Sequence, residues 1–268
     1  MAKGSFVDQL GRAVALDAPA RRVVSLVPSH TELLAELGLD AEVVGITDYC
    51  VRPADWRGRK ARVGGPKRID AARIEAAAPD LVLADREEND RAPVEALARR
   101  RAVWTSDVRS LDDALTMIGL VGPLVGRAPR ADEMAAEIAA RFAELAARRA
   151  SRGGRPRRAA YLVWRGPLMA AATGTFIDAM LRACGFVNVF DAARGRYPTI
   201  APEELRAAAP ELILLPSEPY PFAEADAAEF RVLCPGAAAV AVDGEMFCWP
   251  GARLLRAPAY FEELAASL

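Results

Sequence analysis

The chain has 268 residues, of which 52% are hydrophobic and 26% charged, and its formal net charge is −1 at pH 7. This balance is typical of a soluble globular protein, and it gives no electrostatic basis for binding nucleic acid or an anionic membrane. No segment approaches the apolar length of a membrane span, and the first residues lack the apolar core of a signal peptide. The length suits two domains of about 100–150 residues each.

The first half of the chain alternates strands and helices, which predicts a parallel sheet. It begins with a hairpin around Gly11, and Gly38 is placed to end the first helix. Asp70 is expected to cap a later helix, because its carboxylate can accept a hydrogen bond from a free amide of the first turn. The predicted strands are residues 21–27, 42–48, 81–85 and 102–107, and the predicted helices are residues 28–38, 70–78 and 93–100.

Two segments are nearly copies of each other. IEAAAPDLVLADRE, residues 74–87, matches LRAAAPELILLPSE, residues 205–218, at a constant offset of 131. In each copy a helix is expected to stop at a proline, Pro79 or Pro210, before an apolar strand that is buried in a parallel sheet. A period this long excludes a solenoid repeat and predicts two α/β lobes of similar design, with a ligand cleft between them. Chance similarity between Ala-rich helices is the alternative.

A long helix is predicted to join the two lobes. Residues 129–150 carry apolar side chains at helical spacing, so one face of this helix is expected to be buried. A helix of this length spans about 33 Å. We therefore predict three parts, a first lobe, a connecting helix and a second lobe, at residues 1–125, 126–152 and 153–268.

The basic cluster and the cysteines give weaker signals. Residues 148–158 (RRASRGGRPRR) are expected to form a solvated linker and not a binding patch. The cysteines at positions 50, 184, 234 and 248 form no CxxC pair, which argues against a zinc site. Cys234 and Cys248 flank one strand-like segment, and we expect them to pair only if the protein is exported.

Six segments, taken in order, resemble the class III substrate-binding proteins of ABC importers, which are cobalamin and ferric-siderophore receptors. These segments are RVVSLVPSHTELLAELG, GITDYC, IEAAAPDLVLA, TGTFIDAMLRACGFVNVF, RYPTIAPEELRAAAPELILL and the closing tryptophan, glycine and ARLLRA. DYC and RYP are most similar to the cobalamin-binding branch. The resemblance implies an α/β fold class with two Rossmann-like lobes, parallel-type sheets, one long backbone helix and a ligand in the cleft between the lobes.

The resemblance also implies that the ligand is contacted by loops that follow strands. A flat corrinoid or tetrapyrrole stacks well on aromatic side chains, which bury a large area at low entropic cost. Several aromatics lie in predicted loops beside Pro or Gly, which favours this role over a place in the core. Trp164 is a further candidate, Trp104 is expected in the core, and the place of Trp56 stays open. The matched candidates are Pro28, Ser29, Tyr49, Gly65, Pro66, Tyr197 and Trp249.

Two titratable residues complete the candidate ligand set. His30 is the only histidine, so a bare transition-metal site is not expected, because such a site needs several His or acid ligands. We expect His30 to be either an axial ligand of cobalt or haem iron, or a capping or solvent-facing residue. Arg253 is expected to pair with a carboxylate or phosphate of the ligand, or to form a surface salt bridge. The run REEND, residues 86–90, is expected to be a solvated loop or to offer Glu87 and Asn89 as polar contacts.

The sequence predicts a receptor and not an enzyme, because no nucleophile motif or phosphate-binding loop accompanies these residues. The leading hypothesis is capture of a metal chelate, preferably a corrinoid, for an ABC importer. The alternatives are a ferric-siderophore or haem receptor and a cytosolic corrinoid-binding protein without a transporter. We expect a monomer that requires no cofactor beyond the bound chelate and does not bind nucleic acid. It would be periplasmic or cell-surface if a leader was removed, and cytoplasmic otherwise.

Docking to the importer is the last prediction from the resemblance. In the resembling cobalamin receptors an acid near the start of each repeated helix meets Arg residues of the importer. Glu203 matches this position, whereas Ala72 stands at the equivalent place of the first copy. We expect docking through Glu203, because a carboxylate pairs well with Arg across an interface. Docking is then either lopsided, or Asp70 or Glu75 takes the place of Ala72 in the first lobe. The alternative is that Glu203 only stabilises its own helix.

Overall fold

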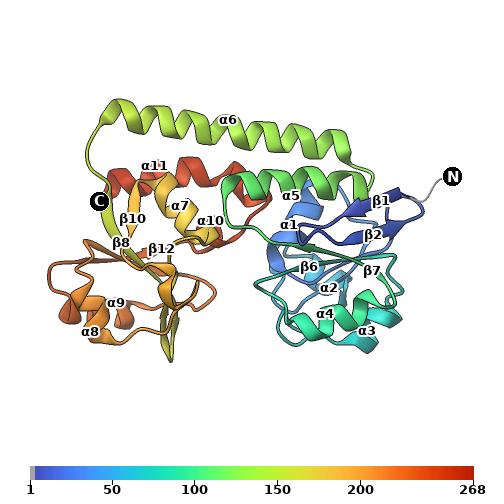
Figure 1. Ribbon diagram of the computed structural model, residues 1–268, viewed down its shortest axis with the longest axis horizontal. Helices are drawn as coiled ribbons and strands as arrows, with labels where there is room; N and C mark the ends of the chain where they lie inside the picture. Colours follow the sequence, from blue (N-terminus) through green and yellow to red (C-terminus); the bar gives the residue numbers. More distant parts are fainter. Residues whose placement is uncertain (1–3) are drawn as a thin grey trace. The chain divides into compact units, whose positions relative to one another are not determined.

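The computed structural model describes residues 4–268 of the chain (Figure 1). Contacts divide the chain into two compact units. Unit 1 comprises the residues up to Val108, Asp112–Ile138 and Pro250–Arg253, and unit 2 comprises Arg109–Leu111, Ala139–Trp249 and Leu254–Leu268. The observed division differs from the predicted boundaries, because the long helix is shared and a short segment near the C-terminus belongs to unit 1.

Unit 1 consists of a hairpin followed by alternating strands and helices. The elements are β1 (Gly4–Val7), β2 (Ala13–Leu16), β3 (Val23–Ser25), α1 (Pro28–Glu36), β4 (Val43–Ile46), α2 (Trp56–Arg59), β5 (Ala61–Arg62), α3 (Ala71–Ala76), β6 (Leu81–Asp85), α4 (Arg91–Ala98), β7 (Ala102–Ser106) and α5 (Leu111–Leu124). The sheet is parallel, as predicted, and its strand order is β5-β4-β3-β6-β7. One of its faces packs Val82 and Ala84 of β6 against Ile74 of α3 and Val94 of α4.

Unit 2 also has a parallel sheet with helices between its strands, but it adds one antiparallel strand. Its elements are β8 (Arg157–Arg165), β9 (Leu168–Ala170), α7 (Phe176–Cys184), β10 (Phe186–Asn188), α8 (Pro202–Ala207), β11 (Leu212–Pro216), α9 (Glu224–Leu233), β12 (Ala238–Val242), α10 (Glu245–Cys248) and α11 (Ala257–Ser267). Four strands are parallel in the order β10-β8-β11-β12, and β9 pairs antiparallel with β8. Ile213 and Leu215 of β11 pack against Leu205 of α8 and Phe230 of α9. The sequence analysis did not predict β9 or α9.

Helix α6 (Ala128–Arg152) confirms the predicted long helix. Its residues up to Ile138 belong to unit 1 and those from Ala139 to unit 2. The apolar stripe at Met134, Ile138 and Phe142 is buried, as its spacing predicts.

The two sequence copies adopt the same local structure. Ala78 and Ala209 end α3 and α8 with positive φ angles of 45° and 44°, a conformation that residues other than glycine rarely adopt. Arg22 Nη2 donates to the Ala77 carbonyl at 2.6 Å, and Arg158 Nη2 donates to the Ala208 carbonyl at 2.6 Å. The same guanidinium groups also bond the carbonyls of the two positive-φ alanines. Each arginine thus accommodates the last carbonyls of its repeated helix as a hydrogen-bond donor. Its positive charge also interacts favourably with the negative C-terminal end of the helix dipole.

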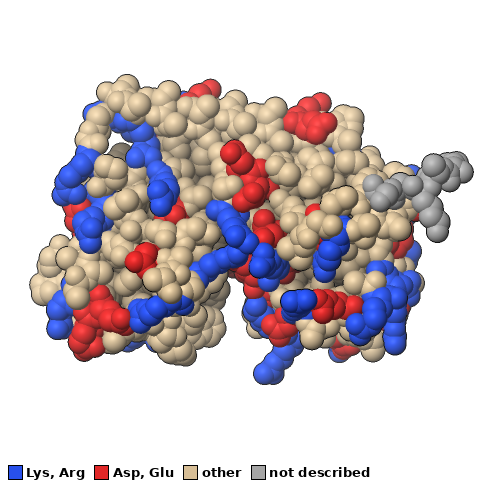
Figure 2. All heavy atoms as spheres, viewed as in Figure 1, with Lys and Arg blue, Asp and Glu red and all other residues tan. Residues whose placement is uncertain are grey.

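The basic cluster that we expected to be a linker is largely ordered structure. Its first half ends α6, where Arg149 donates to the carbonyls of Arg182 and Ala183 at 2.6 and 2.8 Å. Its second half enters β8, and Arg155 forms a bidentate pair with Glu211. Lys and Arg are interspersed with Asp and Glu over the face shown in Figure 2, in keeping with the net charge of −1. No helix within residues 4–268 is long and apolar enough to cross a membrane.

Candidate functional site

The carboxyl ends of the parallel strands carry the candidate residues in both units. In an open parallel sheet, ligands bind beyond the carboxyl ends of the strands at the point where the strand order reverses. That point lies between β3 and β6 in unit 1 and between β8 and β11 in unit 2. The residues directly after these strands and their neighbours are therefore the first candidates for ligand contacts.

Tyr49 offers the most exposed aromatic surface at the edge of unit 1. It lies in the loop after β4 and is 65% exposed. Gly65 lies against its ring, because a Cβ atom built on Gly65 would come within 3.1 Å of Tyr49 Cε2. The amide of Asp48 donates to the Gly64 carbonyl at 2.8 Å, which fixes the two loops together. Two predicted candidates, Tyr49 and Gly65, therefore form one surface.

A buried polar cluster anchors the loop that presents Tyr49. Cys50 is fully buried, and its sulfur lies 3.0 Å from the Thr31 hydroxyl and 3.1 Å from the Thr47 hydroxyl. The Thr31 hydroxyl also donates to Ser25 Oγ at 2.9 Å. Burial raises the pKa of the Cys50 thiol, so it stays protonated at neutral pH. The thiol thus serves as an internal anchor next to the exposed ring.

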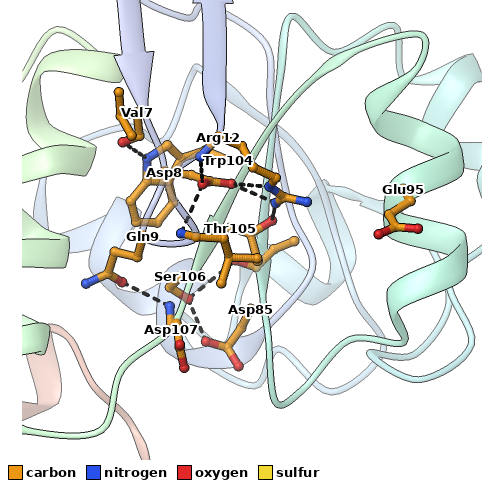
Figure 3. A network of polar contacts seen from close by, with 12 residues as sticks. Val7, Asp8, Gln9, Arg12, Asp85, Glu95, Trp104, Thr105, Ser106 and Asp107 are labelled. Atoms are coloured by element: carbon orange, nitrogen blue, oxygen red, sulfur yellow. Dashed lines mark hydrogen bonds and ion pairs between the residues drawn. The ribbon is translucent and has the colours of Figure 1, made fainter.

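His30 lies in the interior and not at a ligand-facing surface. Figure 3 shows Ser106 at the end of β7, where its hydroxyl donates to Asp85 Oδ2 at 2.5 Å. His30 Nε2 lies 3.1 Å from the same hydroxyl, and Nδ1 has no partner within residues 4–268. Complete burial lowers the pKa of His30 to about 4, which keeps the imidazole neutral at pH 7. His30 is therefore neither solvent-facing nor a side-chain cap of α1, and its role as an axial ligand stays a prediction.

The arrangement of Asp85, Ser106 and His30 is also not that of a hydrolytic triad. In a triad the histidine lies between the acid and the nucleophile, so that it can take the proton of the hydroxyl. Here the serine lies between the other two, and its hydroxyl is fully buried. Burial also raises the pKa of Asp85. This cluster is a structural network.

The N-terminal hairpin braces the same strand end, as Figure 3 shows. Arg12 links the hairpin to β7 through a bond from Nη2 to Thr105 Oγ1 of 2.6 Å, and its Nε donates to Asp8 Oδ2 at 2.8 Å. Gln9 accepts the amide of Asp107 at 3.1 Å. The loop after β7 is therefore held from a segment almost 100 residues earlier in the chain.

Asn89 closes the point of strand reversal in unit 1. Its side-chain amide donates to the Pro66 carbonyl at 2.9 Å and to the Leu26 carbonyl at 3.3 Å, while its oxygen accepts the Asp85 amide at 2.8 Å. Asn89 is 5% exposed, so it ties three loops together and does not present its amide to a ligand. This corrects the expectation of a polar ligand contact. Pro66 remains at the half-buried rim of the same loop.

Arg253 is engaged by Glu32 of α1. Arg253 Nε and Nη2 donate to Glu32 Oε2 and Oε1 at 3.2 and 2.5 Å, and the side chains are 3% and 9% exposed. The pair is a buried, bidentate salt bridge and not a surface one. Pro28 and Ser29 open α1 just before Glu32, Pro28 half-buried and Ser29 buried. Arg253 therefore fixes the start of α1 and is not available for a ligand carboxylate.

Trp164 is the exposed aromatic at the edge of unit 2. It lies near the end of β8, is 43% exposed, and its indole N–H donates to the Gly166 carbonyl at 3.1 Å. Its ring meets Tyr220 edge-on at 5.5 Å, and Tyr220 meets Phe222 at 4.8 Å. The run PYPF after β11 was the available signal for this support. Tyr197 is half-buried in the loop before α8.

Trp249 is buried, contrary to its predicted place on an open loop. It is 3% exposed, and its indole N–H donates to Glu218 Oε1 in a short hydrogen bond. The Cys248 thiol donates to the same oxygen at 3.1 Å. Cys234 and Cys248 are both free thiols and form no disulfide. Glu218, the last residue of the second sequence copy, is the residue that the sequence analysis missed here.

The two docking candidates differ in how their carboxylates are used. Asp70 caps α3 as predicted, because its Oδ1 accepts the Arg73 amide at 3.1 Å and its Oδ2 lies 3.2 Å from Arg73 Nε. Glu203 is exposed in the first turn of α8, where the neighbouring Glu204 accepts the Ala201 amide at 2.6 Å. Glu75 is paired with Arg101. Glu204 therefore caps α8, and the exposed Glu203 carboxylate does not take part in this cap.

Metal-ligating side chains do not gather at these edges. Within the part of the chain that the structure describes, no group of three or more His, Cys, Asp or Glu residues is arranged to hold a metal ion. The edges offer instead the exposed rings of Tyr49 and Trp164, and the carboxylate of Glu218, of which only Oε1 accepts hydrogen bonds from residues 4–268. Such surfaces suit an organic ligand.

Comparison with known proteins agrees with this architecture. A family model described as periplasmic binding protein matches residues 23–230. A vitamin B12-binding protein of Vibrio cholerae is 26% identical over 199 residues, which cover 73% of this chain and 70% of the relative. The crystal structure of the periplasmic vitamin B12 binding protein of Vibrio cholerae superposes with a TM-score of 0.79 at 21% identity, covering 93% of this chain and 99% of that one. The periplasmic haem-binding protein from Roseiflexus sp. RS-1 superposes with a TM-score of 0.73 at 25% identity, covering 92% and 99%.

Proposed function

Because this chain belongs to the periplasmic binding protein family, we propose that it is a receptor that captures a metal chelate, preferably a corrinoid, for an ABC importer. The observation that carries the proposal is the exposed ring of Tyr49 on Gly65, at the carboxyl edge of a parallel sheet. A second exposed ring, Trp164, stands at the corresponding edge of unit 2. Exposed aromatics of this size bury substantial apolar area when a flat macrocycle stacks on them.

We assign the protein a binding role without a catalytic step. The hydroxyl nearest the only histidine belongs to Ser106, which is fully buried and already engaged by Asp85. The family in which the chain falls is one of binding proteins. The protein would act outside the cytoplasmic membrane, beside the importer that receives its ligand.

Calorimetric titration tests the ligand class. The panel comprises cyanocobalamin, cobinamide, haemin and a ferric hydroxamate, with Zn²⁺ and Mn²⁺ as free-metal controls. We expect one chelate to bind in the micromolar range or tighter. Tyr49→Ala and Trp164→Ala should each weaken it by about 1–3 kcal/mol, as is usual for aromatic anchors that become buried on binding. Tyr260→Phe, which keeps the ring of a half-buried tyrosine and removes only the hydroxyl that accepts the Asp243 amide, serves as the control that should leave affinity unchanged. Tight binding of a free metal with no chelate binding would overturn the proposal.

We further propose that Glu203 contacts the importer. Its carboxylate is exposed, and the capping of α8 is already done by Glu204. The alternative that remains is that Glu203, an acid in the first turn, stabilises its own helix through the helix dipole. Asp70 and Glu75 are engaged by arginines of unit 1, so docking is expected to depend more on unit 2 than on unit 1.

Uptake or transporter binding by Glu203→Ala tests this contact. We expect weaker docking with unchanged ligand affinity, since Glu203 lies at the start of a helix and not at a strand's carboxyl end. Glu224→Ala, an exposed acid at the start of α9, is the control and should dock normally. Normal docking by Glu203→Ala would reject the contact and favour a role without a transporter.

A further inference from the structure

Glu218 occupies the point of strand reversal in unit 2. It follows β11 by two residues, and β11 and β8 are the neighbours between which the strand order reverses. Residues at this place in an open parallel sheet face the ligand crevice.

The two oxygens of Glu218 have different surroundings. Oε1 accepts both the Trp249 indole N–H and the Cys248 thiol, which hold the carboxylate in one orientation. Oε2 accepts no hydrogen bond from residues 4–268, and it is not among the polar atoms sealed from solvent. No lysine or arginine of the described chain pairs with Glu218. One oxygen is thus fixed, and the other is left as an open acceptor.

The surroundings of Glu218 make this acceptor costly to leave unpaired. Burial, together with the charges of Glu245 and Asp243, raises its pKa. Burial raises the pKa of Tyr161 on the neighbouring strand β8, with the charges of Cys248 and Glu218 as smaller causes, and its hydroxyl has no hydrogen-bond partner among residues 4–268. A partly desolvated carboxylate among other acids gains from a hydrogen-bond donor and repels another anion.

We propose that Glu218 is a specificity-determining residue that accepts a hydrogen bond from an amide N–H of the ligand and disfavours ligands that carry carboxylates. The proposal rests on the chelate-binding function and names the chemical class within it. Corrinoids carry neutral amide side chains around the ring, whereas haem carries propionate carboxylates. Trp249 and Cys248 are positioning residues, because they orient the carboxylate without meeting the ligand.

The test compares cyanocobalamin and haemin as probes of the amide and carboxylate classes. The measured quantity is the ratio of the haemin Kd to the cyanocobalamin Kd at pH 7.5 or so, by titration calorimetry. Glu218→Gln keeps the shape and removes the charge, and its amide can donate to a carboxylate. We expect it to lower the ratio by about tenfold or more. Glu224→Gln removes the same charge from an exposed site on α9 of the same unit, and it should leave the ratio within about twofold.

A second variant keeps the test decisive if Glu218→Gln does not fold. Glu218→Asp retains the charge but withdraws the oxygens, so cyanocobalamin should bind more weakly while haemin stays as weak as in the wild type. An unchanged ratio in Glu218→Gln, or an equal change in Glu224→Gln, would overturn the specificity role while the chelate function stands. Failure of the wild-type protein to bind either probe would overturn both. These outcomes separate the two proposals.

Discussion

The two sequence copies agree at their amino ends and differ at their carboxyl ends. At the start of β6 and β11, Arg22 and Arg158 bind the ends of the preceding helices in the same way, and Asp80 and Glu211 accept the amides of those arginines at 2.9 and 3.0 Å. Beyond β6 the loops are closed by Asn89, which bonds three backbone groups. Beyond β11 a carboxylate keeps one oxygen open.

In both β6 and β11, the residues at the amino end serve folding, whereas the residues beyond the carboxyl end are available for ligand contacts. The amino ends solve a problem common to both units, which is how to end a helix and enter a buried strand without leaving carbonyls unsatisfied. The carboxyl ends have no such common problem, so their side chains can specialise. Unit 1 closes its reversal point and presents Tyr49 beside it, whereas unit 2 leaves a fixed acceptor at the reversal point itself.

The largest loss of stability is expected from removing the buried salt bridge between Arg253 and Glu32 in unit 1. Arg253→Met removes the bidentate cation that pairs with the buried Glu32 carboxylate, which should lower the free energy of unfolding by about 3–5 kcal/mol. Urea unfolding followed by circular dichroism measures this loss. A loss below about 1 kcal/mol would show that Glu32 finds water or another partner easily, and that the edge is less closed than its contacts indicate.

Asn89→Ala sharpens the same comparison. It leaves the carbonyls of Leu26 and Pro66 and the amide of Asp85 without their partner, so we expect a loss of roughly 2–3 kcal/mol in the free energy of unfolding. Glu218→Gln, at the open edge of unit 2, should cost far less, because its open oxygen bonds nothing in the chain. Equal losses in the two variants would remove the distinction between the edges.

Acid should also weaken unit 1 through His30. The pKa of His30 is about 4 in the folded protein and 6.5 in a model peptide, so the unfolded chain takes up the proton first. The stability present above pH 6.5 is therefore lost as the pH falls towards 4, by roughly 3 kcal/mol in total. His30→Gln should remove this slope, because glutamine does not titrate in this pH range. Its side chain can still form a hydrogen bond with Ser106, so the contact is kept.

The effect of His30 is read as the difference between the two pH profiles. Asp85 acts in the opposite sense, because burial raises its pKa and stability that is present below its unfolded pKa is lost as the pH rises through the folded value. Asp85 is present in both proteins, so subtraction isolates the histidine. Parallel profiles between pH 6.5 and 4 would contradict the burial of a neutral imidazole.

The smallest effects test the shared amino ends. Ala78→Gly and Ala209→Gly should each raise stability by about 0.5–1 kcal/mol, because glycine adopts a positive φ without the strain that a Cβ brings. Ala207→Gly, within α8, is the control and should lower stability by a similar amount. Thermal unfolding measures all three. Changes of opposite sign at Ala78 and Ala209 would show that the two copies are not equivalent.

The repeat, the parallel sheets, the long helix and the Asp70 cap follow from local patterns, and the sequence predicts them. Burial of the candidate residues does not follow from such patterns. Trp249 stands beside Pro and Gly as a loop residue would, yet its indole finds an acceptor 31 residues earlier. His30 meets Ser106 at a distance of 76 residues. Such pairings depend on which strand ends become neighbours.

Exposure of the aromatic residues is likewise not predicted by local sequence patterns. Aromatic residues in loops predict a ligand surface, but only the fold separates Tyr49 and Trp164, which are exposed, from Trp56 and Trp249, which are 3% exposed each. Trp104 was predicted in the core by its place within a strand, and the structure confirms it. Trp164, by contrast, lies in β8 and is 43% exposed, so neither a strand position nor a loop position fixes the burial of a single aromatic residue.

Retention of a coloured chelate by the purified protein tests the central claim most directly. The protein is incubated with cobinamide or haemin, free ligand is removed by gel filtration, and the visible absorbance of the protein peak is recorded. The account predicts corrin absorbance that elutes with the protein in equimolar amount and is strongly reduced in the Tyr49→Ala, Trp164→Ala double variant. A colourless protein peak with every chelate, from protein that binds Zn²⁺ or Mn²⁺ instead, would contradict it.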